Sequence, residues 1–144
     1  MDTVFVLVLL LNSRRPGELQ RIPLHLYDRT PNNQQNYKEF DDTITPCENI
    51  LINIFKRIVI RGKSERSVYV LFNNDVQDHI KILLDYRKKC LSKNNNFLFE
   101  KSKTIEPISG YKILKKYAIL SSAINPQAIM ATKLQKHLET IREC

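Results

Sequence analysis

The chain has 144 residues with 23 Lys or Arg against 15 Asp or Glu, a formal net charge of +8, and 42% of its residues are hydrophobic. This length suits one domain with a modest core. The positive charge favours a polyanionic partner, with nucleic acid ahead of an anionic membrane surface. The alternative is a basic protein that has no acidic partner. The three cysteines, Cys47, Cys90 and Cys144, and the His residues are widely spaced, so no zinc site is recognisable in the sequence. Widely spaced cysteines predict reduced thiols in a nuclear or cytoplasmic protein.

Residues 4–11 form an uninterrupted apolar run, VFVLVLLL. A membrane-spanning helix needs about 20 such residues. Asp2 before the run and the polar residues 12–15 after it do not fit a secretory signal. We therefore expect a buried helix and no membrane partner. Because the run begins almost at Met1, we also expect that the reading frame has lost an upstream region.

Arg14 and Arg15 directly precede Pro16, and proline is favoured at the first position of a helix. Two arginines would then lie at a helix N-terminus, where unpaired backbone N–H groups and the helix dipole suit an anion. Glu18 in the first turn would cap the helix or brace an arginine. The alternative is an exposed turn with two solvated arginines.

Residues 28–43 are polar, which predicts a long surface loop or insertion. A helix with a capping box follows, with Thr45 as the cap, Pro46 at the first position and Glu48 three residues after the threonine. The apolar stripe of this helix, which we expect to be buried, consists of Ile50, Leu51, Ile54 and Phe55.

Residues 58–60 and 68–72 are β-branched and apolar, and they flank a short polar segment, which predicts an antiparallel hairpin. Gly62 permits a tight turn, and Glu65 is the acid among the basic residues of the tip. These basic residues are Arg61, Lys63 and Arg66. A rigid ribbon of this kind could present a lysine to a phosphate. Alternatively, the tip is charged because hairpin tips are exposed to water.

Helical periodicity predicts three helices in the second half of the chain. The first follows a cap at Asn74 or Asp75, buries Val76, Ile80, Leu83, Leu84 and Leu91, and exposes Lys81, Arg87, Lys88 and Lys89. The second covers residues 109–122, with Ile113, Tyr117 and Leu120 inward. The third runs from Gln127 to the end and buries Met130, Leu134, Leu138 and Ile141. The elements together predict an α+β fold that is mainly helical, with helices around a small antiparallel hairpin.

Three segments, in order, resemble the catalytic domain of the tyrosine recombinases, the phage-integrase-like enzymes, and most closely their transposon-derived, Crypton-like branch. Residues 11–19, LNSRRPGEL, are similar to the first arginine box, with Arg15 and Glu18 at its positions. Residues 60–68, IRGKSERSV, resemble the hairpin that carries the catalytic lysine, which Lys63 matches.

The third segment, residues 131–140, is similar to the second arginine box but departs from it. Thr132 stands in place of the family's His, and Gln135 stands in place of its arginine. The chain then ends at Cys144, before the segment that would carry the last His or Trp and the nucleophilic tyrosine. The resemblance implies that residues 1–144 are a single, partial recombinase-like domain, part of a DNA breaking-rejoining catalytic core.

In such enzymes two arginines clamp the non-bridging oxygens of the phosphodiester, and the lysine protonates the leaving oxygen. Gln135 provides neither charge nor a guanidinium fork, and such a loss costs about 2.7–4 kcal/mol by analogy with oxyanion donors. The resemblance therefore implies a DNA-binding relic of an integrase that does not cleave DNA and needs no metal or cofactor. Its partner would be double-stranded DNA, with phosphate contacts from Arg14, Arg15, Arg61, Lys63 and Arg66.

Two alternatives remain open on the sequence. The chain could be a small basic protein-interaction module that has kept the ancestry without the DNA function. It could also be a fragment that folds poorly, because a domain that lacks parts of both ends leaves apolar surface such as residues 4–11 uncovered.

Overall fold

The computed structural model describes residues 1–30, 45–62, 65–90, 95–101 and 104–143. In chain order the elements are α1 (Asp2–Asn12), α2 (Pro16–Leu19), α3 (Leu24–Arg29), α4 (Pro46–Ile54), β1 (Lys56–Arg61), β2 (Ser67–Phe72), α5 (Asn74–Cys90), α6 (Gly110–Leu120), the 3-10 helix η3 (Pro126–Ala128) and α7 (Ala131–Glu143). The fold is α+β and mainly helical, with one antiparallel pair of strands among the described residues, which confirms the predicted class. Residues 31–43 of the predicted polar loop lie outside the described residues, whereas Asp28 and Arg29 belong to α3.

Helix α1 lies at the centre of the core, as its apolar run predicts. It packs against β2, α5 and α6, and the ring of Phe5 meets that of Phe99 edge-on at 5.2 Å between centroids. The buried side chains of α1 are Val4, Phe5, Val8, Leu9 and Asn12. Since α1 is apolar on all sides, Leu7 and Leu10 remain 40% and 46% exposed. Within the described part of the chain, no helix combines the length and the apolar character that a bilayer crossing requires.

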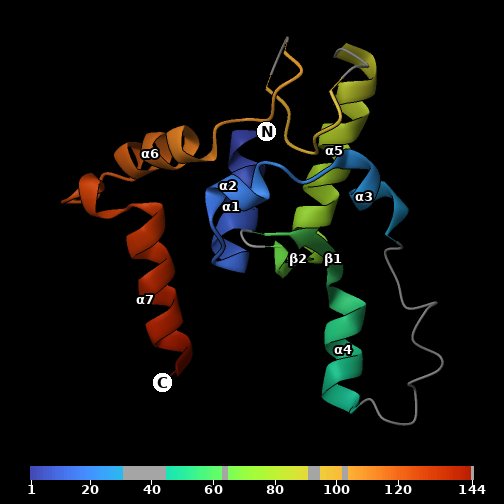
Figure 1. The fold of residues 1–144 in the computed structure, drawn as a ribbon, viewed down its shortest axis with the longest axis horizontal. Helices are drawn as coiled ribbons and strands as arrows, with labels where there is room; N and C mark the ends of the chain where they lie inside the picture. The colour runs from blue at the N-terminus through green and yellow to red at the C-terminus, as the bar shows by residue number, and fades with distance from the viewer. Residues whose placement is uncertain (31–44, 63–64, 91–94, 102–103, 144) are drawn as a thin grey trace.

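The hairpin forms as predicted, with Ile58 opposite Val70 at the middle of the antiparallel register. Alternation along the strands turns one face inward, and this face contributes Ile58, Ile60, Val68, Val70 and Phe72 to the core. The inward face also carries the buried Lys56, while the other side chains of β1 and β2 point outward. Figure 1 shows the hairpin beside the lower end of α1 and at the lower end of α5, with α4 and α7 projecting downward on either side of it.

Helix α4 has the predicted capping box but does not bury the predicted stripe. Thr45 Oγ1 accepts a hydrogen bond from the Glu48 backbone N–H, and Glu48 Oε2 accepts one from the Thr45 backbone N–H. Three of the four predicted residues nevertheless face solvent, with Ile50, Leu51 and Ile54 exposed by 58%, 53% and 38%, while Phe55 is partly buried. Helical periodicity shows that one face is apolar, but it does not show whether another element covers that face.

Helix α5 begins as predicted, but its cap is Asn73, whose Oδ1 accepts a hydrogen bond from the Val76 N–H at 3.0 Å, rather than Asn74 or Asp75. The prediction of a solvated Arg87 is wrong. Arg87 is 9% exposed, forms an ion pair with Glu100 at 3.0 Å and donates to the Phe97 carbonyl at 2.6 Å. The position of Arg87 continues the buried stripe of α5, so the side chain points into the protein. Leu91 lies outside the described residues.

The last two helices are shorter than predicted and less buried. In α6, Ile113 is buried and Tyr117 is partly buried, but Leu120 is 65% exposed. Helix α7 begins at Ala131 and not at Gln127, which belongs to η3. Met130, which the sequence predicts to be buried, is 50% exposed. Leu134 is partly buried, while the side chains of Leu138 and Ile141 lie outside the described residues.

Candidate nucleic-acid interface

The first predicted segment is a short turn of helix that holds two arginines at its start. Arg15 is the N-cap of α2 in an extended conformation, and Pro16 occupies the first helical position as predicted. Buried Pro16 and Leu19 anchor this turn, which leaves Arg15 exposed and Arg14 partly exposed. Because α2 has only 4 residues, its dipole is small, and attraction for an anion rests on the arginine charges.

The hairpin tip is closed by a hydrogen bond from the Gly62 N–H to the Arg66 carbonyl at 2.8 Å. The residue in the left-handed region is Glu65, with φ of 59°, and not the glycine. Gly62 is needed for space, since a Cβ there would lie 2.5 Å from Val68 Cγ2 and 3.2 Å from Glu18 Oε1. The turn therefore uses glycine for close packing rather than for its backbone freedom.

Glu18 Oε1 lies beside Gly62, so the first and second segments are neighbours in the fold. Glu18 belongs to α2, one turn after Arg15, and Gly62 directly follows β1 at the hairpin tip. Lys63 lies outside the described residues, but its chain neighbour Gly62 is packed against Glu18. Two exposed arginines flank this turn, so the described cations of this surface are Arg14, Arg15, Arg61 and Arg66.

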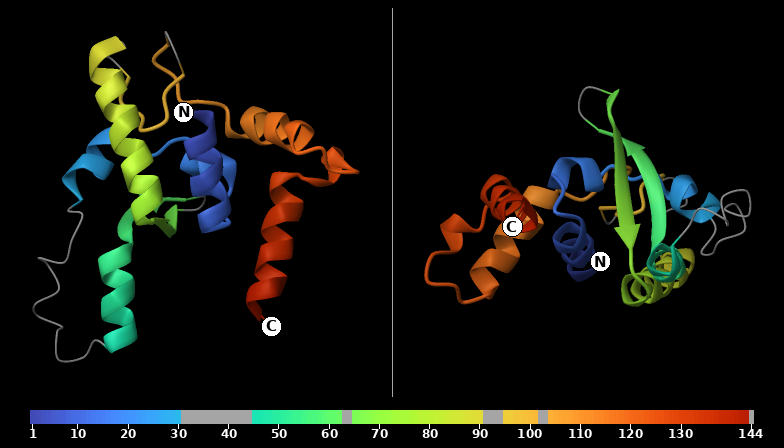
Figure 2. Two further views of the ribbon diagram at one scale, coloured as in Figure 1. Left: turned by 180° about the vertical axis from the view of Figure 1, so that it is seen from behind. Right: turned by 90° about the horizontal axis from the view of Figure 1, so that it is seen from below.

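The third segment lies elsewhere. Thr132 is exposed and Gln135 is partly buried at the start of α7. In the views of Figures 1 and 2, α1 and α2 lie between α7 and the hairpin. Thr132 instead lines a mainly apolar cavity of about 310 Å³ between α6, η3 and α7. The residues of the third segment are therefore not packed against the hairpin.

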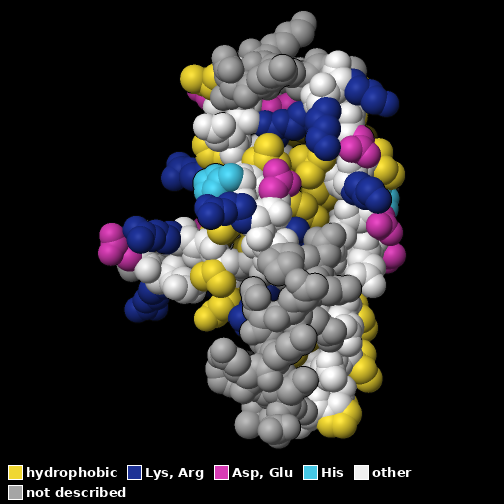
Figure 3. Space-filling model, turned by 90° about the vertical axis from the view of Figure 1, so that its right-hand side faces the viewer, with side chains coloured by type: hydrophobic (Ala, Val, Ile, Leu, Met, Phe, Trp, Pro, Cys, Tyr) yellow, Lys and Arg dark blue, Asp and Glu magenta, His cyan; other side chains and the backbone are white. Residues whose placement is uncertain are grey.

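A second groove, between α3 and α5, carries charges of both signs. Its charged lining consists of Lys56, Lys81, Lys88, Asp28, Asp78 and Asp85. Figure 3 shows Lys and Arg side chains interspersed with Asp and Glu side chains on this side of the molecule. Since three lysines face three aspartates, this groove has no net attraction for a polyanion.

Lys56 and Tyr27 pack together at the inner edge of this groove, with the ammonium 3.9 Å from the ring centroid. Burial lowers the pKa of Lys56, an effect that Asp28 opposes. Burial, assisted by the charge of Asp28, raises the pKa of Tyr27 to about 12. Both side chains belong to the core, and this contact is structural.

Sequence reasoning did not single out Tyr69 and Arg57 on the outer face of the hairpin. Arg57 Cζ lies 5.1 Å from the centroid of the Tyr69 ring, and Tyr69 is 48% exposed. The signal that could have found them is the two-residue period of a strand, which places outward residues of paired strands side by side.

The described residues contain no group of three His, Cys, Asp or Glu that could hold a metal ion. Cys47 is a free, exposed thiol, while Cys144 and the side chain of Cys90 lie outside the described residues. Comparison of the chain with protein-family models, with curated proteins and with solved structures gave no match. Function is therefore inferred from the chain's own residues and their geometry.

Proposed function

We propose that this chain binds double-stranded DNA through the surface formed by the start of α2 and the hairpin tip, as a relic of a tyrosine recombinase catalytic domain. The observation that carries the proposal is the packing of Gly62 against Glu18, because it joins two of the three segments that resemble the family. Two basic segments, whose nearest cations Arg15 and Arg61 are 46 residues apart, would then act on one phosphate backbone, whose contacts supply most of the affinity of nonspecific DNA binding.

The same arrangement does not favour strand cleavage. Gln135 carries no charge to replace the family's second arginine, and it lies on α7, away from the hairpin. A single clamp provides less stabilisation of the charged transition state than a pair of arginines does. We therefore expect DNA binding without the formation of a covalent protein–DNA adduct.

The test is a fluorescence anisotropy titration of the full chain with a labelled DNA duplex at several salt concentrations. We expect the logarithm of the association constant to fall linearly with the logarithm of salt, by about 0.9 for each phosphate neutralised. The double variant Arg15→Ala with Lys63→Ala should bind more weakly, and its slope should be smaller by about 2.

The matched control removes the same charge at the far end of α5, with Lys88→Ala and Lys89→Ala. Both lysines are exposed, and the Lys88–Asp85 ion pair at 3.8 Å contributes little to stability because both side chains are solvated. If both double variants lose the same affinity, binding is a response to net charge and the proposed surface is wrong. Absence of duplex binding at low salt would favour the protein-interaction module instead.

A further inference from the structure

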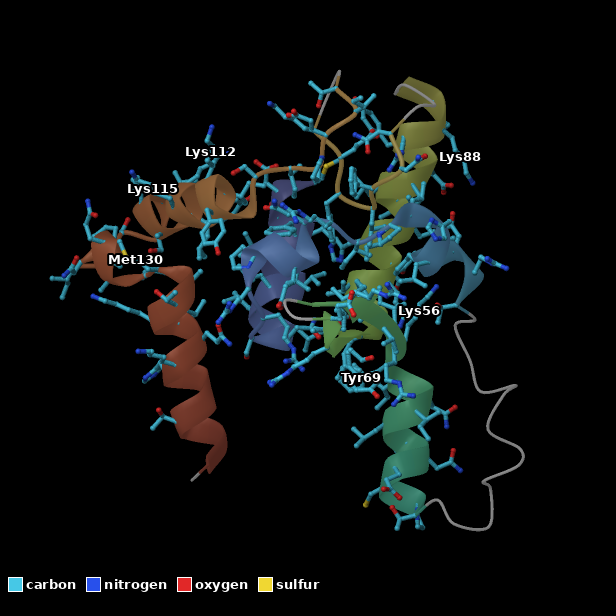
Figure 4. All side chains as sticks on the ribbon, viewed as in Figure 1. Lys56, Tyr69, Lys88, Lys112, Lys115 and Met130 are labelled. Atoms are coloured by element: carbon cyan, nitrogen blue, oxygen red, sulfur yellow. The ribbon has the colours of Figure 1, made fainter. Side chains whose placement is uncertain are left out.

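The outer face of the hairpin combines an exposed aromatic ring with positive charge. Strand alternation turns six side chains away from the core, and these are Arg57, Val59, Arg61, Ser67, Tyr69 and Leu71. None of these six is acidic. Figure 4 shows Tyr69 on the side of the hairpin that points away from α5. This face is therefore suited to a ligand that carries both negative charge and flat apolar surface.

Tyr69 lies near the middle of β2, directly opposite Val59, and the two side chains are 48% and 42% exposed. A tyrosine ring has only two side-chain torsions to order, so it offers a large contact area at a small entropic cost. Arg57 holds its guanidinium 5.1 Å from the ring centroid, a cation–π distance that restrains the ring further. The ring is thus positioned before any ligand arrives.

Arg57 and Arg61 lie four residues apart on β1, about 13 Å along the strand at 3.3 Å per residue. Tyr69 pairs with the residue midway between them, Val59. A base stacked on Tyr69 would therefore have a cation on each side of it along the strand. Proteins that bind single strands combine aromatic side chains that stack on bases with positive charge along the backbone, and this face offers both.

We propose that this outer face binds single-stranded nucleic acid by stacking an unpaired base on Tyr69, with Arg57 and Arg61 attracting the neighbouring phosphates. Bases inside a duplex are already stacked on one another, so the face of a base is available only in a single strand. The inference goes beyond the proposed function, because it concerns another ligand and is centred on Tyr69, although the two surfaces share Arg61 at the end of β1.

The experiment measures the anisotropy of a labelled single-stranded oligonucleotide of about 10 nucleotides, within the range of known binding sites. Loss of stacking costs about 1–3 kcal/mol per base, so Tyr69→Ala should weaken binding about 5- to 150-fold. Tyr69→Phe keeps the ring and should bind within about twofold of the wild type. The matched control Tyr86→Ala, at a tyrosine that is 59% exposed on α5, should leave binding unchanged.

A second readout locates the contact directly. An oligonucleotide that carries a photoreactive halogenated uracil should cross-link to the peptide containing Tyr69, as located by mass spectrometry. Equal binding by wild type and Tyr69→Ala, or no binding of the single strand by the wild type, would overturn the proposal. Equal losses in Tyr69→Ala and Tyr69→Phe would also overturn it, because the hydroxyl rather than stacking would then hold the ligand.

The two proposals fail separately. The double variant Arg15→Ala with Lys63→Ala should weaken duplex binding. When Tyr69→Ala is added to this double variant, it should reduce the affinity for the single strand by the same factor as it does in the wild type. Tyr69→Ala should leave duplex binding unchanged. Since Tyr69 faces solvent, thermal unfolding of Tyr69→Ala should match the wild type closely, and this measurement separates a lost contact from a lost fold.

Discussion

The side chain of Asn12 pairs with the backbone of Leu71 as a neighbouring strand would. Its Nδ2 donates to the Leu71 carbonyl at 2.8 Å, and its Oδ1 accepts from the Leu71 N–H at 2.7 Å. The same Nδ2 also donates to the Val8 carbonyl at 2.9 Å. Asn12 is 6% exposed at the C-terminal end of α1. One amide therefore ties the central helix to β2 and satisfies the backbone groups of a residue on the sheet edge.

Replacement of Asn12 by Ala should destabilise the protein by about 1–3 kcal/mol, because the Leu71 N–H and C=O then lose their partners. Urea unfolding monitored by circular dichroism measures this change. The control is Asn53→Ala, since Asn53 bonds only within exposed α4, to Asn49. We expect that control to change the free energy of unfolding by less than about 0.5 kcal/mol. Equal effects would show that Asn12 does not link α1 to β2.

Replacement of Gly62 by Ala should destabilise the hairpin tip by about 1–3 kcal/mol, because the new methyl group would overlap the Val68 side chain. It should also weaken duplex DNA binding if the tip moves away from Glu18. The control is Gly17→Ala, where the nearest atom to the added Cβ would be Tyr111 Cε2 at 3.9 Å, an ordinary contact. Gly17→Ala should be neutral or slightly stabilising in unfolding experiments, and a stable Gly62→Ala protein with full affinity would contradict the packing at the tip.

The buried Arg87–Glu100 ion pair should show strong coupling in a double-mutant cycle. Arg87→Ala leaves the Glu100 carboxylate buried without its cation and should cost about 3–5 kcal/mol. The double variant should cost clearly less than the sum of the two single changes. The exposed Lys88–Asp85 pair on the same helix serves as the control, with an expected coupling below about 1 kcal/mol. Thermal or urea unfolding of the four proteins in each cycle measures both couplings.

Tyr27 should make stability depend on pH in the alkaline range. Its pKa is about 12 in the folded protein and about 10 in the unfolded chain, so between these values only the folded state keeps the proton. Stability is therefore lost as pH rises through this window, by about 1 kcal/mol at pH 11. Urea unfolding of Tyr27→Phe should lack this loss, while Tyr86→Phe, changed at an exposed tyrosine, should behave like the wild type. Ultraviolet absorbance should reveal one late-titrating tyrosinate that Tyr27→Phe removes.

The elements that the sequence predicted well depend on short-range chemistry. The capping box of α4 is complete within four residues, from Thr45 to Glu48. The hairpin follows from two β-branched runs close together in the chain, and the continuous apolar run of α1 indicates a buried element. In each case the residues that determine the structure are neighbours, so the pattern carries the information.

Tertiary structure decided which of the apolar and charged faces are covered. The α4 stripe at Ile50 and Leu51 is apolar yet exposed, while Arg87 is charged yet buried beside Glu100. The packing of Gly62 against Glu18 joins positions far apart in the chain. Periodicity along a helix or strand fixes which side chains share a face. What that face meets depends on how distant segments pack, and this is decided only when the whole chain folds.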